Sequence, residues 1–334
     1  MSHDGRSLPR RPKVLTGLPV LRRGDDEIQL GLDPRHAVVI GGVTKTVAES
    51  IQNLDGHVRT RQLLDKAPPG DRPTLSGLLS ELHELGLIED VTETAMPGRL
   101  APDATTWSLR TGNQPGQLAA TRTKSSVLVH GSGRLGLAVA QLLVTAGIGT
   151  VEVDADGIVE AEDTGCGYRD EDIGKPRAEV ARSRLPSAHV TEPDLVVLTD
   201  AAVPTPEFVT SLLSRSVPHL SVRVREGIGI VGPFVVPGRS SCLGCADLHR
   251  ADLDHDWPAV AAQLVGQRQH ADLTCAHATA ALGAEQAMRA LEWLSVGGTR
   301  PPIWNGTIEL DPFHGKLEQR PWPPHVFCSC GARQ

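Results

Sequence analysis

A glycine-rich loop between an expected strand and an expected helix constrains the fold of this chain most. An apolar run at residues 127–129 leads into Gly131-Ser132-Gly133-Arg134-Leu135-Gly136, and a helical pattern follows it. In a βαβ unit that binds a nucleotide, the first glycine permits a tight turn. The second lets a phosphate approach the backbone, and the third lets the helix pack closely on the sheet. The helix start adds free N–H groups and the positive end of a dipole. We therefore predict that Gly131, Gly133 and Gly136 face a phosphate.

An acidic residue follows the loop at the spacing that this kind of fold requires. A second strand-like run, residues 151–153, ends at Asp154, about 20 residues beyond the glycines, where a carboxylate accepts hydrogen bonds from ribose hydroxyls. Asp156 lies two residues further on. Further buried runs alternate with helical segments downstream. This alternation predicts an α/β domain over residues 126–334, with a Rossmann-like, mostly parallel sheet.

Residues 14–91 carry a different pattern. Three short strand-like runs precede three helical segments, and a further apolar pair then opens another strand. In the third helical segment, leucines recur at intervals of three and four residues, which places them on one helix face; they are Leu75, Leu78, Leu79, Leu82 and Leu85. The order of strands, three helices and a strand predicts a small winged-helix-like α+β domain.

Two segments outside these domains lack clear periodicity. Residues 1–13 are polar with several basic side chains and no apolar core behind them, so we expect a disordered tail rather than a signal peptide. Residues 92–125 are rich in Pro, Gly, Thr and Ala. That composition predicts a linker with room for one short helix.

The overall composition excludes several classes of protein. The net charge is -7, which disfavours nucleic acid as a partner because phosphate binding needs clustered Lys and Arg. No apolar run approaches the roughly 18 residues that a membrane helix needs, so no membrane partner is expected. We expect a cytoplasmic protein. Its six cysteines are then metal ligands or free thiols more readily than disulfides.

Four of the cysteines occur as two close pairs. Cys242 and Cys245 are separated by two residues, and Cys328 and Cys330 by one. Two pairs on turns can present four thiolates to one ion, which favours a structural tetrahedral zinc that fastens the C-terminus to the domain. The alternatives are unrelated free thiols or a redox pair.

The remaining polar and sulfur-containing residues carry weaker signals. Cys166 and Cys275 are each candidates for a nucleophile, but a free cysteine is more often a small buried apolar residue. A cluster of histidines and aspartates after the first cysteine pair offers metal-ligating groups, although a solvated surface accounts for it more simply. Its members are His249, His255, His270, Asp252, Asp254 and Asp256.

Taken together, the motifs of residues 126–334 resemble the ThiF family, the adenylyltransferases that include the ubiquitin-activating enzymes. The resemblance rests on the glycine loop, on the stretch from Asp154 to Glu160, on the tract at residues 172–179, on Asp200 at the end of a strand, and on the paired cysteines. It implies ATP and magnesium as cofactors, with Asp154 on the ribose and Asp156 close by. It also implies Asp200 near magnesium and the phosphates, zinc at the cysteines, and a homodimer.

The chain departs from the family at the groups that hold the phosphates. Where the family has Asn-x-x-Arg-Gln, residues 162–169 are acidic and lack both the Asn and the Arg-Gln pair. The essential lysine of the following tract falls at Arg177, which keeps the charge but not the compact ammonium. Arg169 and Lys175 are candidates to compensate. Because adenylation depends on positive charge against the phosphates, these changes predict a partly degenerate site.

Residues 14–91 resemble the PqqD-like domains, which hold the leader of a ribosomally made peptide as an added strand. Both halves together resemble the ThiF-type leader-binding partners of YcaO cyclodehydratases. The resemblance implies a protein that binds a precursor peptide and presents it to a cyclodehydratase-type enzyme.

Three other functions remain open on the sequence. An active ATP-dependent adenylyltransferase, acting on a peptide or a sulfur-carrier protein, would use Asp200 and Arg177. A nicotinamide dehydrogenase fits the glycine loop but leaves the paired cysteines unexplained. A winged-helix DNA reader is opposed by the acidic net charge.

Overall fold

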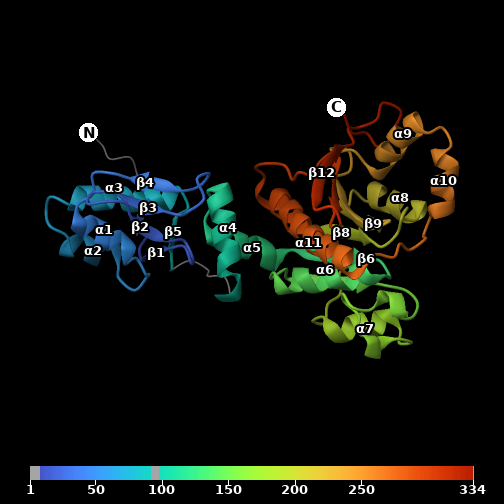
Figure 1. The fold of residues 1–334 in the computed structure, drawn as a ribbon, viewed down its shortest axis with the longest axis horizontal. Coiled ribbons are helices and arrows are strands. Elements are labelled where there is room, and N and C mark those ends of the chain that lie inside the picture. The colour runs from blue at the N-terminus through green and yellow to red at the C-terminus, as the bar shows by residue number, and fades with distance from the viewer. Residues whose placement is uncertain (1–7, 92–97, 334) are drawn as a thin grey trace. The chain divides into compact units, whose positions relative to one another are not determined.

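The computed structural model describes residues 8–91 and 98–333, and the chain divides into two compact units, residues 1–120 and 121–334. Figure 1 labels the helices and strands of both units. Each unit has its own apolar core.

The N-terminal unit contains the predicted order of strands, three helices and a strand. It is built from β1 (Pro12–Val14), β2 (Val20–Arg22), β3 (Ile28–Leu30), β4 (Val38–Ile40), α1 (Lys45–Gln52), α2 (Thr60–Lys66), α3 (Arg72–Glu84) and β5 (Ile88–Asp90). Strands β2, β3 and β4 form an antiparallel sheet in that order, and β1 pairs with β5 in a second small sheet.

Local sequence explains where the helices of this unit lie. Thr44 caps α1 because its hydroxyl accepts the backbone N–H of Val47 at 3.3 Å. The leucine stripe of α3 faces inward, with Leu75 and Leu79 fully buried and Leu82 almost so. These side chains meet residues from β3, α1 and β5 in the unit's core. The predicted stripe is therefore the face that this helix packs, except at Leu85, which follows the end of α3 and is exposed.

The structure corrects both predictions for the segments outside the domains. Residues 1–7 and 92–97 lie outside the described residues. Residues 10–13, predicted to be tail, instead lie along β5, because Pro12 opens β1 and the Asp90 carboxylate accepts the N–H groups of Arg10 and Arg11. The expected linker contains η1 (Gly98–Leu100), α4 (Ala101–Thr111) and α5 (Pro115–Lys124).

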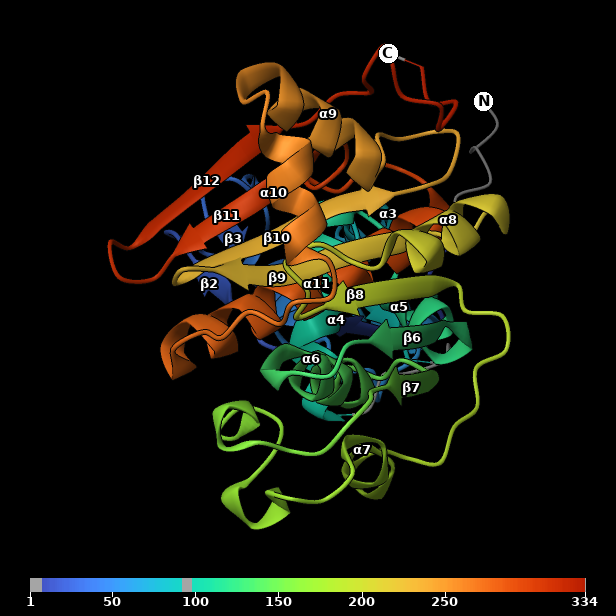
Figure 2. The same cartoon turned by 90° about the vertical axis from the view of Figure 1, so that its right-hand side faces the viewer.

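Seven strands form the sheet of the C-terminal unit, as Figure 2 shows. They are β6 (Ser126–His130), β7 (Thr150–Asp154), β8 (Leu195–Thr199), β9 (His219–Arg225), β10 (Ile228–Val235), β11 (Gly306–Asp311) and β12 (Lys316–Pro321). Their order is β12-β11-β10-β9-β8-β6-β7. The four neighbouring strands β7, β6, β8 and β9 run parallel, whereas β10, β11 and β12 join by antiparallel pairing. The expected α/β class is present, and the sheet is mixed because hairpins extend its second half.

Helices cover both faces of this sheet. On one face, α6 (Arg134–Thr145) and α11 (Leu273–Val296) pack on Val127, Val129 and Val197. On the other, α8 (Pro206–Ser214) packs on Val196 and Leu198. Successive side chains of a strand point to opposite faces of the sheet, and here helices cover both faces. Strand β8 is therefore buried along its whole length.

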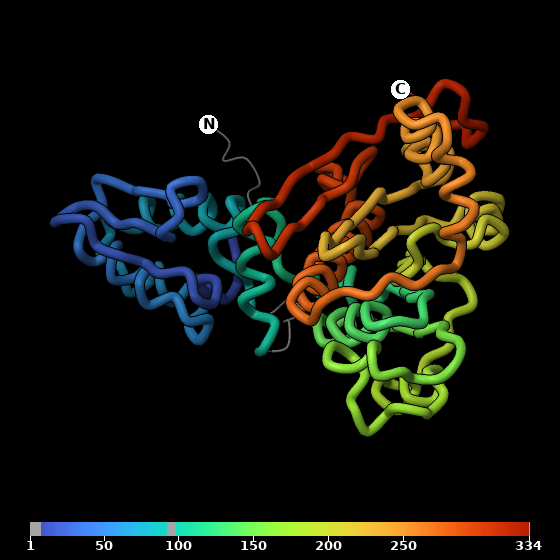
Figure 3. The backbone as a smooth tube through the Cα atoms, turned by 45° about the vertical axis from the view of Figure 1, so that its right-hand side comes forward, coloured from blue at the N-terminus to red at the C-terminus, as the bar shows by residue number. Residues whose placement is uncertain are grey.

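The C-terminal unit contains further helical elements. They are η2 (Ala161–Asp163), η3 (Asp170–Asp172), α7 (Arg177–Arg184), α9 (Leu243–Leu253) and α10 (Trp257–Leu264). Figure 3 shows α9 beside the chain end that carries the last two cysteines, which agrees with their sulfur contacts. Across the described parts of the chain, no helix is both long and apolar enough to cross a bilayer.

Candidate functional site

The glycine loop and Asp200 form one hydrogen-bonded unit. Strand β8 ends beside β6, so its last residue and the following Asp200 reach the start of α6. The Asp200 carboxylate accepts the N–H groups of Leu135 at 2.9 Å, Gly133 at 3.1 Å and Gly136 at 3.2 Å. The Thr199 hydroxyl donates to the same carboxylate at 2.8 Å. The N–H groups that the sequence predicts for a phosphate therefore bind a carboxylate of the chain itself.

The glycines are required by this close approach. A Cβ on Gly133 would lie 2.7 Å from Oδ1 of Asp200, and one on Gly131 would lie 2.0 Å from Oγ1 of Thr199. A Cβ on Gly136 would lie 2.9 Å from the carbonyl oxygen of Gly131. Any side chain at these positions would displace the end of β8.

Asp200 is held under strain in a dry environment. Its φ of 67° lies in the left-handed region, and its side chain is almost fully buried. Burial raises the pKa of this carboxyl above its usual value, against the effect of the hydrogen bonds from Leu135 and Thr199. A strained, buried acid at the carboxyl end of a parallel strand is a candidate for a functional residue in this kind of sheet.

Arg177 lies at the bottom of a second polar cluster. Its guanidinium donates to Oδ2 of Asp163 at 2.6 and 3.0 Å, to Oε2 of Glu160 at 3.3 Å and to the carbonyl of Asp156 at 2.9 Å. Arg268 reaches the same two carboxylates, with Oε2 of Glu160 at 2.6 Å and Oδ1 of Asp163 at 3.4 Å. Two guanidinium groups and two carboxylates thus neutralise one another.

A cavity of about 340 Å³ joins these two clusters. Its lining includes Ser132 of the glycine loop, the buried Asp200, and both arginines, Arg177 and Arg268. The volume lies at the small end of the range of about 300–1,000 Å³ that ligand pockets occupy.

Asp154 occupies the predicted place at the end of β7. Its Oδ2 lies 2.8 Å from Nδ1 of His130, the last residue of β6, and the His130 ring stacks on Phe208 with centroids 4.2 Å apart. The hydrogen bond from His130 lowers the pKa of Asp154, so the acid is ionised at neutral pH. Half of the Asp154 side chain is exposed and is available to a ligand.

The two candidates for a compensating charge point elsewhere. Lys175 lies 3.4 Å from Oδ1 of Asp172, and Arg169 lies 3.3 Å from Oε1 of Glu171. Neither belongs to the lining of the cavity. Arg268, which no motif indicated, is the cation that joins Arg177 there.

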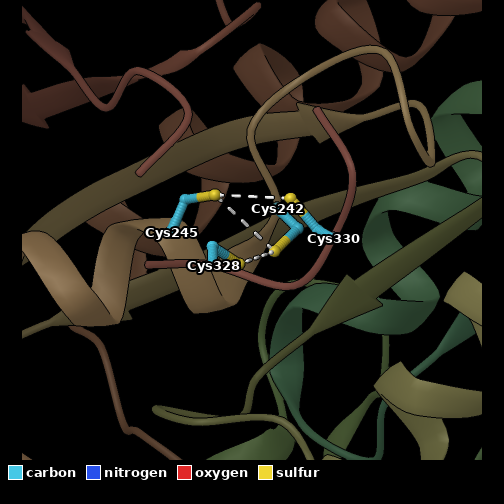
Figure 4. Close-up of side chains that lie close together, drawn as sticks. All are labelled: Cys242, Cys245, Cys328 and Cys330. Carbon is cyan, nitrogen blue, oxygen red and sulfur yellow. Dashed lines mark hydrogen bonds between the residues drawn. The ribbon is translucent and has the colours of Figure 1, made fainter. Parts of the chain in front are cut away.

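Four cysteine sulfurs gather where α9 meets the C-terminal segment, as Figure 4 shows. The Sγ atom of Cys242 lies 3.9 Å from that of Cys245 and 3.5 Å from that of Cys328, and the sulfurs of Cys245 and Cys330 are 3.6 Å apart. Edges of a tetrahedron of ligands at about 2.3 Å from a metal measure about 3.8 Å. The four thiols that the sequence predicted as ligands therefore fit one tetrahedral metal ion.

Only part of the histidine and aspartate cluster comes together. His249 and Asp252 lie on α9 beside His325, and Nε2 of His325 bonds Oδ2 of Asp252 at 2.9 Å. His255 is exposed next to Asp256. The contacts of His325 and Asp252 tie the C-terminal segment to α9.

The two other cysteines differ in their surroundings. Cys275 is fully buried in the core. The Cys166 sulfur lies 3.6 Å from Nδ1 of His277, but burial raises the pKa of this thiol to about 11, which opposes a reactive thiolate at neutral pH.

The glycine loop at the start of α6, the acid at the end of β7 and the cavity beside them define a Rossmann-like α/β protein of the nucleotide-binding type. Within that class, residues 113–202 match the sequence model of the ThiF family. The matched segment carries the glycine loop, Asp154 and Asp200, and there the chain is similar to the ThiF family. No curated protein sequence matches the chain.

Solved structures share the fold over nearly the whole chain. Crystal structures of E. coli MccB with ATP and with MccA-N7isoASN match with TM-scores of 0.69 and 0.68 at 16% identity, over 96% of this chain and 99% of theirs. A heterocyclase in complex with substrate and cofactor matches with a TM-score of 0.68 at 14% identity. There the match covers 97% of this chain and 40% of the heterocyclase chain.

Proposed function

We propose that this protein binds the leader of a ribosomally made precursor peptide and presents it to a partner enzyme of the cyclodehydratase type. We propose further that its adenylation site is partly degenerate. The proposal for the site rests on the charges of the cavity, which neutralise one another. Arg177 and Arg268 pair with Asp163 and Glu160, while Asp200 binds the glycine loop.

The charge balance argues against efficient adenylation. Catalysis of this reaction requires positive charge and N–H donors that are already aimed at the phosphate oxygens. Among the described residues that line the cavity, Arg177 and Arg268 are the only Lys or Arg side chains, and both are paired. A triphosphate would have to displace Asp163 or Glu160 from these arginines and Asp200 from the loop. Leaving the buried Asp163 carboxylate without its arginine costs about 3–5 kcal/mol, whereas Glu160 is exposed and is displaced more easily.

The fold of the N-terminal unit supports the peptide-binding part. In the described residues β4 pairs with β3 alone and leaves its other edge open, and an extended peptide can add to such an edge. The Thr44 hydroxyl bonds Asp71 at 3.0 Å, which holds the start of α1, the helix after β4, near the start of α3. E. coli MccB, which shares the fold, has been crystallised with the peptide MccA, and the heterocyclase with its substrate.

An active ATP-dependent adenylyltransferase is the second candidate. It is favoured by the crystal structure of E. coli MccB with ATP and by the position of Asp154, whose ionised, half-exposed carboxylate suits a ribose. In this function Asp200 would hold magnesium after leaving the glycine loop, and Arg177 would release Asp163 to face the phosphates.

ATP–pyrophosphate exchange separates the two functions. The full chain is assayed with the precursor peptide encoded nearest to its gene, and peptide binding is measured in parallel by fluorescence anisotropy. We expect peptide binding without exchange above background. Exchange that requires the peptide and disappears in Asp200→Ala would establish the adenylyltransferase and refute the degenerate site. Absence of peptide binding would refute the leader-binding function.

We also propose that Cys242, Cys245, Cys328 and Cys330 hold a structural zinc. Sulfur-to-sulfur distances of 3.5–3.9 Å support a tetrahedral thiolate set, which zinc accepts without redox chemistry. Metal analysis of the purified protein tests it, with zinc near one per chain expected. A disulfide between Cys242 and Cys245 would contradict it.

A further inference from the structure

A basic groove lies in the N-terminal unit, between residues 8–11 and the start of α2. Its volume is about 680 Å³. The groove is lined by Leu8, Pro9, Arg10, Arg11, Arg59, Thr60, Arg61, Leu64 and Asp65. It forms no part of the cavity beside the glycine loop, whose lining residues all belong to the C-terminal unit.

Four arginines of the groove face a single carboxylate, that of Asp65. This local excess of positive charge stands in a chain whose net charge is -7. The contacts of Arg10, Arg11 and Arg59 are made by their backbone N–H groups, with Asp90 and Gln62 as acceptors. Within the described ranges, no ion pair engages the guanidinium groups that line the groove.

The walls of the groove are fastened together. The backbone N–H of Thr60 donates to the carbonyl of Arg10 at 3.0 Å, and its hydroxyl donates to the carbonyl of Pro9. Thr60 is buried, so these bonds are shielded from water. Leu8 and Leu64 give the groove apolar surface beside the charges. The backbones of the two walls are therefore held together before any ligand arrives.

We propose that this groove binds an acidic segment of a peptide. Carboxylates of the peptide pair with the guanidinium forks of the arginines, and an apolar side chain of the peptide packs on Leu8 and Leu64. The volume admits only a few residues. A nucleic acid fits less well, because four arginines beside leucines offer neither an aromatic stacking surface nor an extended basic track. This inference rests on the proposed function, since it names the chemistry of the peptide that the protein would capture.

Fluorescence anisotropy with the full chain tests this assignment. The probe is a labelled ten-residue peptide of alternating glutamate and leucine, and the matched control peptide has glutamine in place of glutamate. We expect saturable binding of the acidic probe that weakens with salt. The double variant Arg59→Gln with Arg61→Gln should weaken probe binding roughly ten-fold. A control variant, Arg23→Gln with Lys66→Gln, removes the same charge from the same unit outside the groove and should bind as the wild type.

Several outcomes would overturn the assignment. They are equal binding of the glutamine peptide, equal losses in both double variants, and tighter binding of a single-stranded oligonucleotide of the same length. An Asp4→Asn variant that binds the probe ten-fold more tightly would assign the groove to the chain's own N-terminal segment. If the precursor binds unchanged by the Arg59 and Arg61 substitutions, the groove assignment fails and the leader-binding function stands. If the acidic probe binds but no precursor does, the groove assignment stands and the leader-binding function fails.

Discussion

The ion pair between Arg177 and Asp163 can be measured by a double-mutant cycle. Both side chains are almost completely buried, with 4% and 2% of their surface exposed. Arg177→Met removes the charge and keeps most of the side-chain volume, and Asp163→Leu does the same for the acid. The cycle asks whether the cavity's arginine is committed to its own acid or remains available to a ligand.

The expected magnitudes follow from what each variant leaves behind. Arg177→Met leaves the Asp163 carboxylate with Arg268 at 3.4 Å and the N–H of Glu160 at 2.9 Å. Asp163→Leu leaves the guanidinium with Glu160 and the carbonyl of Asp156. Each single change strands a buried charge and should cost about 3 kcal/mol, whereas the double change removes both charges and should cost about 1–2 kcal/mol. The coupling energy is the sum of the two single costs less the cost of the double change, and should therefore be about 4–5 kcal/mol.

Urea unfolding followed by tryptophan fluorescence measures these costs in the relevant unit. Of the five tryptophans, four lie in residues 121–334, so the signal reports mainly on the unit that contains the pair. The slopes of the transitions should be equal among the variants, which keeps the free energies comparable. If the two single effects add to within about 0.5 kcal/mol in the double variant, the arginine is not committed to this acid and the charge argument is refuted.

Three further predictions concern the metal cluster, a buried histidine and the glycine loop. Cys328→Ser should lose the bound zinc and lower the melting temperature, while Cys166→Ser should keep both; equal zinc content by metal analysis would contradict this. Burial lowers the pKa of His219 in the folded state, so the neutral imidazole contributes fully to stability above the unfolded pKa of about 6.5. As the pH falls below that value the unfolded state binds a proton first, and the free energy of unfolding falls by up to about 1.4 kcal/mol per pH unit. The free energies of unfolding of the wild type and of His219→Gln should diverge between about pH 7 and about pH 5, a range that spans the unfolded pKa of histidine. Parallel curves would refute a lowered pKa for His219. Gly133→Ala should cost about 1–3 kcal/mol in thermal unfolding, because its Cβ would lie 2.7 Å from Oδ1 of Asp200; an unchanged melting temperature would show that the carboxylate moves freely.

The sequence predicts those parts of the fold that depend on local pattern. The glycine loop lies between β6 and α6 as its spacing requires, since a tight turn and a helix start are short-range features. The first cysteine pair lies at the start of α9 rather than on a turn, and the pairs meet because the C-terminal segment brings the second pair against that helix start. Residues 98–124 contain more helix than the one short helix expected in the linker, and the reason is local: Pro102 and Pro115 occupy the first turns of α4 and α5, where proline starts helices.

The charges of the cavity could not be predicted in this way. Arg268 meets Asp163 across 105 residues of sequence, from a loop with no periodicity. The acidic residues 162–169, which include Asp163, indicated a loss of positive charge in the sequence, whereas the structure pairs Asp163 with two arginines. The partner of an isolated charge depends on tertiary packing. Residue types alone therefore indicated the acidic change in residues 162–169 but not that Arg268 would pair with Asp163.

Asp200 also carries a prediction that separates its two possible roles. Its carboxylate uses the N–H groups of Gly133, Leu135 and Gly136, which form the anion site of the loop. If Asp200 occupies that site as an internal anion, Asp200→Ala frees the three donors and pyrophosphate should bind more tightly.

The gain should be roughly ten-fold, the equivalent of about one hydrogen bond to a charged group, because some of the freed donors will bind water instead. Isothermal titration calorimetry with pyrophosphate and magnesium measures it. The wild type is the reference, and thermal unfolding checks that the variant remains folded. If Asp200 instead holds magnesium for a nucleotide, the same variant should bind pyrophosphate more weakly. Weaker binding by a folded variant would therefore refute the internal-anion role and restore Asp200 to the family's chemistry.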